Sequence, residues 1–149
     1  MLLYYKSACD AAEQLFLYKS FIVIAHCLYI ADTDQMGRGV FTSEDISKGS
    51  VIEIAPVLVM SAAERKLLDK TLLHDYIFEW GEKNKECCMA LGWVSVYNHS
   101  YKSNCEYEMD YDRKTITIKT VRRIKAGEEL FINYSGSWDA TKRVWFDAK

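Results

Sequence analysis

Two asparagines and a histidine lie close together in a polar stretch near the middle of the chain. Asn98, His99 and Ser100 follow the apolar run 89–97, and Asn104 comes shortly after them. An asparagine side chain carries a donor and an acceptor, so it can bind the edge of a nucleobase or hold a backbone segment. Both asparagines can equally be turn residues at the end of a strand. The ordinary pKa of histidine suits a general base.

Two further stretches carry residue types that suit a binding site. Gly37 and Gly39 flank Arg38, and a glycine pair of this kind lets a backbone approach another molecule closely. The pair is also common in simple turns, and the third glycine and following helix of a dinucleotide-binding fingerprint are missing. The second stretch, 127–134, begins with a turn glycine and two glutamates, continues with Leu130–Ile132 and ends on Tyr134. A buried tyrosine at a strand end can be structural, with its hydroxyl bound to backbone.

Length and composition indicate one globular domain with an ordinary core. The chain has 149 residues, of which 50% are hydrophobic and 27% charged, and its net charge is −2. This charge provides no basic surface for a nucleic-acid backbone. The five cysteines have no CxxC spacing, which argues against a disulfide framework and against a zinc site.

The hydrophobic pattern predicts a mostly β protein with a few short helices. Residues 1–20 are expected to form a short helix, and the uncharged run that follows is too short to cross a bilayer. A capping box, Ser61 with Glu64, predicts a helix that continues to Lys70. The expected strands are Phe21–Tyr29, Val51–Met60 (one or two strands, broken by Pro56), Asp75–Trp80 with one aromatic face, Cys87–Tyr97, a hairpin of Glu106–Asp112 with Thr115–Val121, and 128–134.

The first strand of this hairpin has an acidic face. Glu106, Glu108, Asp110 and Asp112 share one parity and therefore one side of the strand. Such a face is most often simply solvated. It can also attract a basic peptide, because several like charges create a local field that the net charge does not reveal.

Three stretches in this order, GRGVFT at 37–42, NHSYKSNC at 98–105 and GEELFINY at 127–134, resemble the SET-domain family of protein-lysine methyltransferases. The resemblance covers most of the chain, and compact bacterial or viral members without zinc modules are the most similar in layout. It implies a SET fold of several small β-sheets with a C-terminal pseudoknot that brings Asn98 and Tyr134 together. It also divides the chain into an N-terminal extension, 1–20, of unknown role, and a SET domain, 21–149.

The resemblance implies a role for each matching residue. The activity would be methyl transfer from S-adenosylmethionine to a lysine side chain of a protein, with Tyr134 at the catalytic centre. The cofactor would be bound by Gly37, Arg38, Gly39, Asn98 and His99, although the Arg38 side chain is better explained as solvated. Tyr107 would line the lysine channel with Tyr134, or else pack in the core. His99 would then serve cofactor binding and structure rather than act as a base.

The chain departs from the family pattern in two places. Many members close the site with a cysteine-rich zinc module, but here no cysteine follows Cys105, so no metal is expected. An aromatic residue is expected to cover the cofactor instead: Trp145, with Phe146 or Trp138 as alternatives. Near Ala55, where some members have a further channel aromatic, this chain has none, which leaves the number of methyl groups transferred open.

The chemistry is consistent with these residues. A lysine amine has a pKa of about 10.4, and an apolar channel beside a sulfonium disfavours its ammonium form, so no strong protein base is required. The expected partner is a basic protein with an exposed lysine, such as a histone, with no nucleic acid or membrane, and a homodimer can form through the apolar N-terminal residues. The expected location is intracellular: cytoplasmic, or nuclear if the source is eukaryotic or the protein acts in a host. The alternatives are a non-catalytic SET-like module that binds a peptide, and a methyltransferase for another acceptor.

Overall fold

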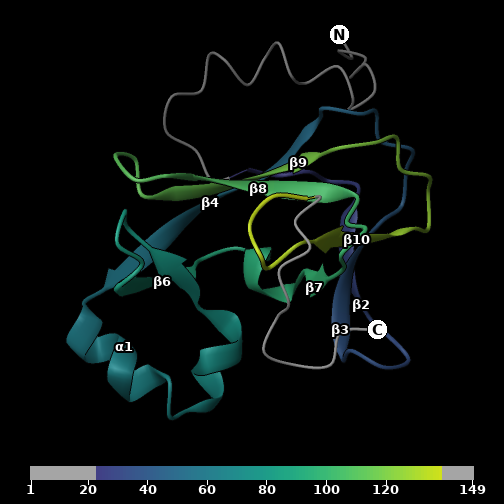
Figure 1. Cartoon of the computed structure of the whole chain (residues 1–149). Coiled ribbons are helices and arrows are strands. Elements are labelled where there is room, and N and C mark those ends of the chain that lie inside the picture. Colours follow the sequence, from purple (N-terminus) through teal and green to yellow (C-terminus); the bar gives the residue numbers. More distant parts are fainter. Residues whose placement is uncertain (1–22, 139–149) are drawn as a thin grey trace, which may run out of the picture.

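The structure, a computed structural model, describes residues 23–138 (Figure 1). Strands are the main secondary structure of this range, which confirms the predicted mostly β class. The strands are β1 (Val23–Ile24), β2 (Leu28–Asp32), β3 (Arg38–Thr42), β4 (Val51–Met60), β5 (Phe78–Trp80), β6 (Glu86–Ala90), β7 (Asn98–His99), β8 (Cys105–Asp110), β9 (Thr115–Thr120) and β10 (Glu129–Ile132). The helices are α1 (Ala62–Leu68) and the 3-10 helices η3 (Leu72–Tyr76) and η4 (Val94–Val96).

The first sheet has the order β5-β6-β4-β9-β8, with β1 paired to β4 as well. β4 is one continuous strand, so the predicted break at Pro56 is wrong. Pro56 lies where β4 changes partner: β1 pairs with Glu53 and Ile54, whereas β6 begins to pair at Val57. The Pro56 carbonyl accepts a hydrogen bond from the Leu91 N–H at 2.9 Å. A missing N–H is tolerated at this gap in the ladder.

The second sheet has the order β2-β3-β10-β7 and contains the parallel pair β7 and β10. Phe131 is opposite Asn98 and Ile132 is opposite His99 in this pair, so two segments distant in sequence lie side by side (Figure 1). The buried Asn104 side chain extends the contact along β10. Its Nδ2 donates to the Glu129 carbonyl at 2.8 Å and its Oδ1 accepts from the Phe131 N–H at 2.7 Å.

The hairpin of β8 and β9 is confirmed, but β8 ends at Asp110. Asp112 therefore lies in the turn and does not extend the acidic face of the strand. Asp110 accepts a hydrogen bond from the Arg113 N–H at 2.8 Å, which shapes this turn. In β8, Glu108 is exposed and the cross-strand partner of Glu106 is Lys119.

Helix α1 begins at the predicted capping box. The Ser61 hydroxyl accepts from the Glu64 N–H and the Glu64 carboxylate accepts from the Ser61 N–H, and the helix ends slightly before the predicted Lys70. None of its residues is fully buried, so α1 stands beside the first sheet rather than inside a core (Figure 1).

Two predicted strands are shorter than expected, because local turns interrupt them. The range Asp75–Trp80 begins in η3, and only Phe78–Trp80 is a strand. The N-cap of η3 is Thr71, whose hydroxyl accepts a hydrogen bond from the Leu73 N–H at 3.2 Å. The range Cys87–Tyr97 is strand only to Ala90 and then turns through η4. No residue of η3 is fully buried, whereas Val94 of η4 is, so the apolar run of the second range is explained partly by packing of η4. The predicted strand Phe21–Tyr29 is divided between β1 and β2, and its first two residues lie outside the described range.

Candidate functional site

Asn98 connects the glycine pair to the C-terminal motif. Its Nδ2 donates to the Arg38 carbonyl at 3.2 Å and to Glu129 Oε1 at 2.7 Å. Gly39 leaves room for this arrangement, because a Cβ there would collide with the Glu129 carboxylate and lie 3.0 Å from Asn98 Nδ2. With both amide hydrogens used, the Asn98 side-chain oxygen remains as an acceptor.

The other two residues of the glycine motif have different environments. Gly37 adopts φ +69°, a left-handed conformation that strains any residue with a side chain, although nothing lies within 4 Å of a Cβ there. The Arg38 side chain is exposed, and the residue contacts Asn98 through its backbone carbonyl. The solvated alternative for the Arg38 side chain is therefore the better description.

Tyr134 is positioned by the segment that contains Asn98 and His99. Its hydroxyl donates to the Tyr97 carbonyl at 2.7 Å, and its N–H donates to His99 Nδ1 at 3.1 Å. The second bond requires a neutral His99 with its proton on Nε2. The predicted approach of Asn98 and Tyr134 in space is thus observed, through the β7–β10 pair and the two hydrogen bonds.

Burial changes the proton affinities of both rings. It lowers the pKa of His99, which keeps the imidazole neutral and able to accept from Tyr134. Burial, with smaller contributions from Tyr76 and the Asp75 carboxylate, raises the pKa of Tyr134 to about 12. Tyr134 is therefore a neutral hydroxyl at physiological pH and can orient a ligand, but it cannot act as a phenolate base.

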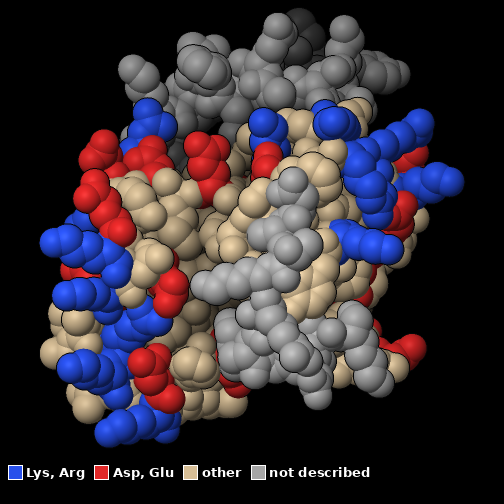
Figure 2. All heavy atoms as spheres, viewed as in Figure 1, with Lys and Arg blue, Asp and Glu red and all other residues tan. Residues whose placement is uncertain are grey.

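A cavity of about 850 Å³ begins at Tyr134 and extends toward α1. Tyr107 lines the same cavity, and its ring packs edge-on against Phe78 with centroids 5.6 Å apart. Figure 2 shows this face of the molecule hollowed over uncharged residues, with carboxylates among the residues around the hollow. The cavity also has a charged lining: Arg65, Asp69, His74, Asp75, Glu79 and Glu108. Tyr134 thus stands between the cavity and the cluster of Gly39, Asn98 and His99.

A buried carboxylate holds the turn that leads to Asn98. Glu53 is fully buried, and its Oε1 accepts from the Trp93 N–H at 2.6 Å. Burial raises the pKa of Glu53, and the backbone hydrogen bond from Trp93 opposes this effect. Gly92 is required beside it, because a Cβ there would collide with Glu53 Oε1 and lie 3.0 Å from the Ala55 Cβ. Glu53 therefore fixes η4, and with it the Tyr97 carbonyl that binds Tyr134.

Sequence reasoning missed three carboxylates and could not place one aromatic residue. Glu53 is a lone charge in an apolar strand, which is a signal for a buried partner, and Glu129 stands within the third motif. Asp75 had no signal of its own, because it was expected on a strand. Trp145 and its alternative Phe146 lie outside the described residues, whereas Trp138 is 44% exposed and its carbonyl accepts from the Ser103 hydroxyl at 3.3 Å.

Comparisons with known proteins agree with this geometry. Residues 37–135 match the SET domain family. A histone-lysine N-methyltransferase of Schizosaccharomyces pombe, specific for lysine 37 of H3, is 36% identical over 84% of this chain and 80% of its own. A solved structure from Plasmodium falciparum, assigned as a histone methyltransferase, is 28% identical with a TM-score of 0.58, over 74% of this chain and 99% of its own.

The chain therefore belongs to the SET domain family, whose fold the two sheets reproduce. The predicted class, a SET-type protein-lysine methyltransferase, is confirmed by these matches. No helix within residues 23–138 combines the length and apolar character needed to cross a bilayer. Over the same residues, no group of three or more His, Cys, Asp or Glu side chains is arranged to hold a metal ion.

Proposed function

We propose that this protein transfers a methyl group from S-adenosylmethionine to the side-chain amine of lysine in a basic protein. The observation that supports this most strongly is the position of Tyr134. Its backbone N–H donates to His99 and its hydroxyl donates to the Tyr97 carbonyl, and Tyr134 lines the cavity. An enzyme for this reaction needs a donor site and an acceptor site that meet at one point.

The residues around Gly39 suit an amino-acid-like cofactor. The Asn98 side-chain oxygen and the Glu129 carboxylate are acceptors for an ammonium group, and the missing side chain of Gly39 leaves room for the Glu129 carboxylate beside Asn98. Gly37, the Arg38 backbone and His99 complete the proposed cofactor site, with Trp145 proposed to cover it. The cofactor supplies an electrophilic methyl group on a sulfonium. The protein's part is to align this group with the lysine amine and to exclude water.

Tyr107 and Tyr134 are proposed to line the lysine channel. Both are neutral hydroxyl-bearing rings, because burial raises the pKa of each. An apolar aromatic wall disfavours a charged ammonium, which helps the substrate amine lose its proton to solvent. Tyr134 can then orient the amine with a hydroxyl that is itself held by the Tyr97 carbonyl.

The charges of the cavity favour a basic substrate. Its lining includes four carboxylates and one arginine, Arg65, which offsets the charge of one carboxylate, so the remaining charge is negative. The relative named as specific for H3 lysine 37 makes histones the first acceptors to test. A non-catalytic peptide-binding module would have the same cavity, but it would not need the hydrogen-bonded Tyr134 hydroxyl.

The proposed SET domain covers residues 21–149, after an N-terminal extension of residues 1–20. Because the proposed substrate is a histone, the proposed location is intracellular, and nuclear if the source is eukaryotic. A homodimer and the absence of nucleic-acid binding stay predictions.

Mass spectrometry of acceptor proteins tests the proposed function. The protein is incubated with S-adenosylmethionine carrying a trideuterated methyl group and with recombinant core histones. We expect labelled lysine in the acceptor, and no label with an Asn98→Ala variant at the same cofactor concentration. A folded protein that binds the cofactor but labels no lysine would favour the peptide-binding module. Label on another type of residue would show that this residue, and not lysine, is the acceptor.

A further inference from the structure

The cavity beside Tyr134 is larger than one lysine side chain requires. Its volume of about 850 Å³ is in the range that holds drug-sized ligands, about 300–1,000 Å³. The lining changes along its length. Tyr134, Tyr107 and Phe78 form an aromatic part, and the side chains around Arg65 form a charged part. A segment of substrate chain therefore fits together with its lysine.

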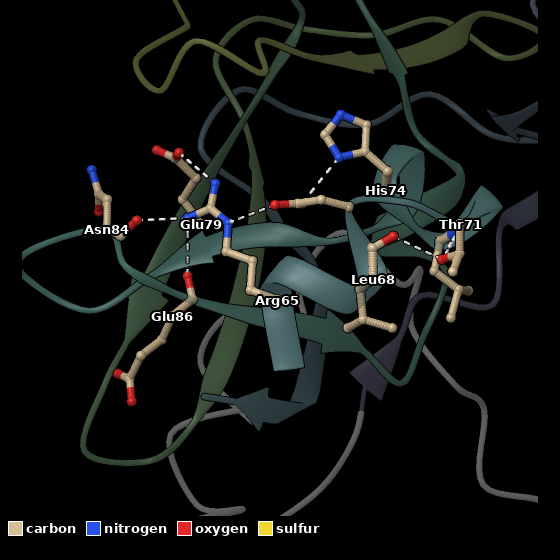
Figure 3. A network of polar contacts seen from close by, with 9 residues as sticks. Arg65, Leu68, Thr71, His74, Glu79, Asn84 and Glu86 are labelled. Atoms are coloured by element: carbon tan, nitrogen blue, oxygen red, sulfur yellow. Dashed lines mark hydrogen bonds and ion pairs between the residues drawn. The ribbon is translucent and has the colours of Figure 1, made fainter. Parts of the chain in front are cut away.

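Most of the charged side chains in this lining already have partners (Figure 3). Arg65 donates to Glu79 Oε1 at 2.9 Å and to the carbonyls of Asn84 and Glu86 at 2.6 and 3.3 Å. Asp69 lies 4.0 Å from the Arg65 Nε and 3.2 Å from His74 Nδ1. This network ties α1 to β5 and β6, and Arg65 offsets one of the two negative charges of Asp69 and Glu79.

Asp75, like the exposed Glu108, differs from the residues of this network, because its carboxylate makes no hydrogen bond or ion pair within residues 23–138. Its backbone is nevertheless fixed. Thr71 caps the start of η3, and the carbonyl of the next residue, Tyr76, accepts from the Ser95 hydroxyl at 2.8 Å. Asp75 lines the same cavity as Tyr134, and its charge contributes to the raised pKa of the Tyr134 hydroxyl. A fixed negative charge thus acts on the end of the cavity where the amine would react.

We propose that Asp75 binds the ammonium form of the target lysine at the Tyr134 end of the cavity, before the amine loses its proton and reacts. This inference rests on the proposed function. A free lysine is an ammonium at neutral pH, so an unpaired carboxylate on the cavity wall attracts it. The proton then leaves to solvent, and the nitrogen lone pair becomes available for the methyl group.

The same charge has two opposite effects on the reaction. It strengthens binding of the ammonium, and it also stabilises the ammonium against loss of its proton. Removing the charge should therefore weaken substrate binding and move the rise of kcat with pH to lower pH. A residue that only supports the fold would not produce this combination. The other ionisable groups that face this space are unchanged in an Asp75 variant: Arg65 of α1 and the C-cap residue Asp69, His74 and Tyr76 of η3, Glu79 of β5, Cys87 of β6, Tyr107 and Glu108 of β8, Tyr111 of the β8–β9 turn, and Tyr134.

Asp75→Asn tests the assignment, because asparagine keeps the shape and removes the charge. The matched control is Asp112→Asn, a carboxylate of the exposed β8–β9 turn that is outside the cavity. Initial rates are measured on recombinant core histones from pH 6.5 to 9.5. We expect the KM for histone to rise about 2- to 5-fold, the range for one exposed ion pair. The KM for the cofactor should not change, and the kcat profile should move to lower pH.

Three further outcomes separate the possible failures. Asp75→Glu should retain most of the wild-type histone KM, since it restores the charge, and melting curves should show that all variants fold. An active wild type whose KM and pH profile are unaffected by Asp75→Asn would overturn the role of Asp75 alone. An equal change in Asp112→Asn would show a general effect of charge and also overturn it. A wild type that methylates no histone would contradict the proposed function, and the role of Asp75 with it.

Discussion

Replacing Gly39 with alanine should damage cofactor binding more than it damages the fold. The new Cβ would collide with the Glu129 carboxylate, which would have to move and give up its 2.7 Å hydrogen bond from Asn98 Nδ2. The end of a glutamate side chain moves at little cost, so the fold should tolerate the change. The Asn98 amide should change its position, because it loses one of the two hydrogen bonds that hold it.

The size of the effect follows from this hydrogen bond. A hydrogen bond to a charged group contributes about 1.5–3 kcal/mol, and each 1.4 kcal/mol is tenfold in affinity. We therefore expect Gly39→Ala to weaken S-adenosylmethionine binding by about 10- to 150-fold, measured by isothermal titration calorimetry. Glu129→Gln, which keeps an acceptor but removes its charge, should give a smaller loss.

Gly127→Ala is the matched control, because Gly127 lies outside the proposed cofactor site. Nothing lies within 4 Å of a Cβ at Gly127, but φ is +84°. The cost should therefore be conformational, about 1 kcal/mol of stability, and the hydrogen bonds of Asn98 should remain. Wild-type cofactor affinity in a folded Gly39→Ala protein would refute this account of the Asn98–Glu129 contact. An equal loss of affinity in both variants would also refute it.

Two further predictions concern the β7–β10 region. Asn104→Ala should lower the free energy of unfolding by about 2–4 kcal/mol, because two buried backbone groups of β10 lose their partner. Urea denaturation measures this change, and a loss below about 1 kcal/mol would contradict the prediction. Burial lowers the pKa of His99 below its ordinary 6.5, so the unfolded chain binds its proton first as the pH falls. The contribution of His99 to stability should be complete above about pH 6.5 and be lost as the pH falls through the folded pKa. The free energy of unfolding should then fall by at most about 1.4 kcal/mol per pH unit. If a His99→Gln variant shows the same dependence on pH below 6.5, His99 is not its source.

The segments of the second and third motifs, which contain Asn98 and Tyr134, meet in the fold. The family resemblance predicted that Asn98 and Tyr134, which are distant in sequence, lie close together. The structure shows the pairing of β7 with β10 that brings their segments side by side. The capping box at Ser61 and the hairpin of β8 and β9 are local signals, and both are confirmed. Local chemistry and short-range pairing are therefore readable from the sequence.

The remaining features depend on contacts that no local pattern reveals. Pro56 is accepted within β4 because the strand changes partner there, and β1 and β6 are far from Pro56 in sequence. The η4 turn replaces a predicted strand because Glu53 binds the Trp93 N–H across the fold. The environment of Asp75 depends on the network around Arg65, which joins α1, β5 and β6. These are tertiary effects, and they override periodicity.

The most direct test of the central claim is a single-turnover experiment with Tyr134→Phe. This variant removes only the hydroxyl that donates to the Tyr97 carbonyl and keeps the ring in the cavity wall. Enzyme in excess is mixed with S-adenosylmethionine and core histones, and transfer of label to lysine is followed by mass spectrometry. We predict cofactor affinity within about 3-fold of wild type and a rate of transfer lower by about 100-fold or more, the range expected for a positioned hydroxyl at a reaction centre. An equal rate in the variant would remove the Tyr134 hydroxyl from the mechanism and contradict the account of the site.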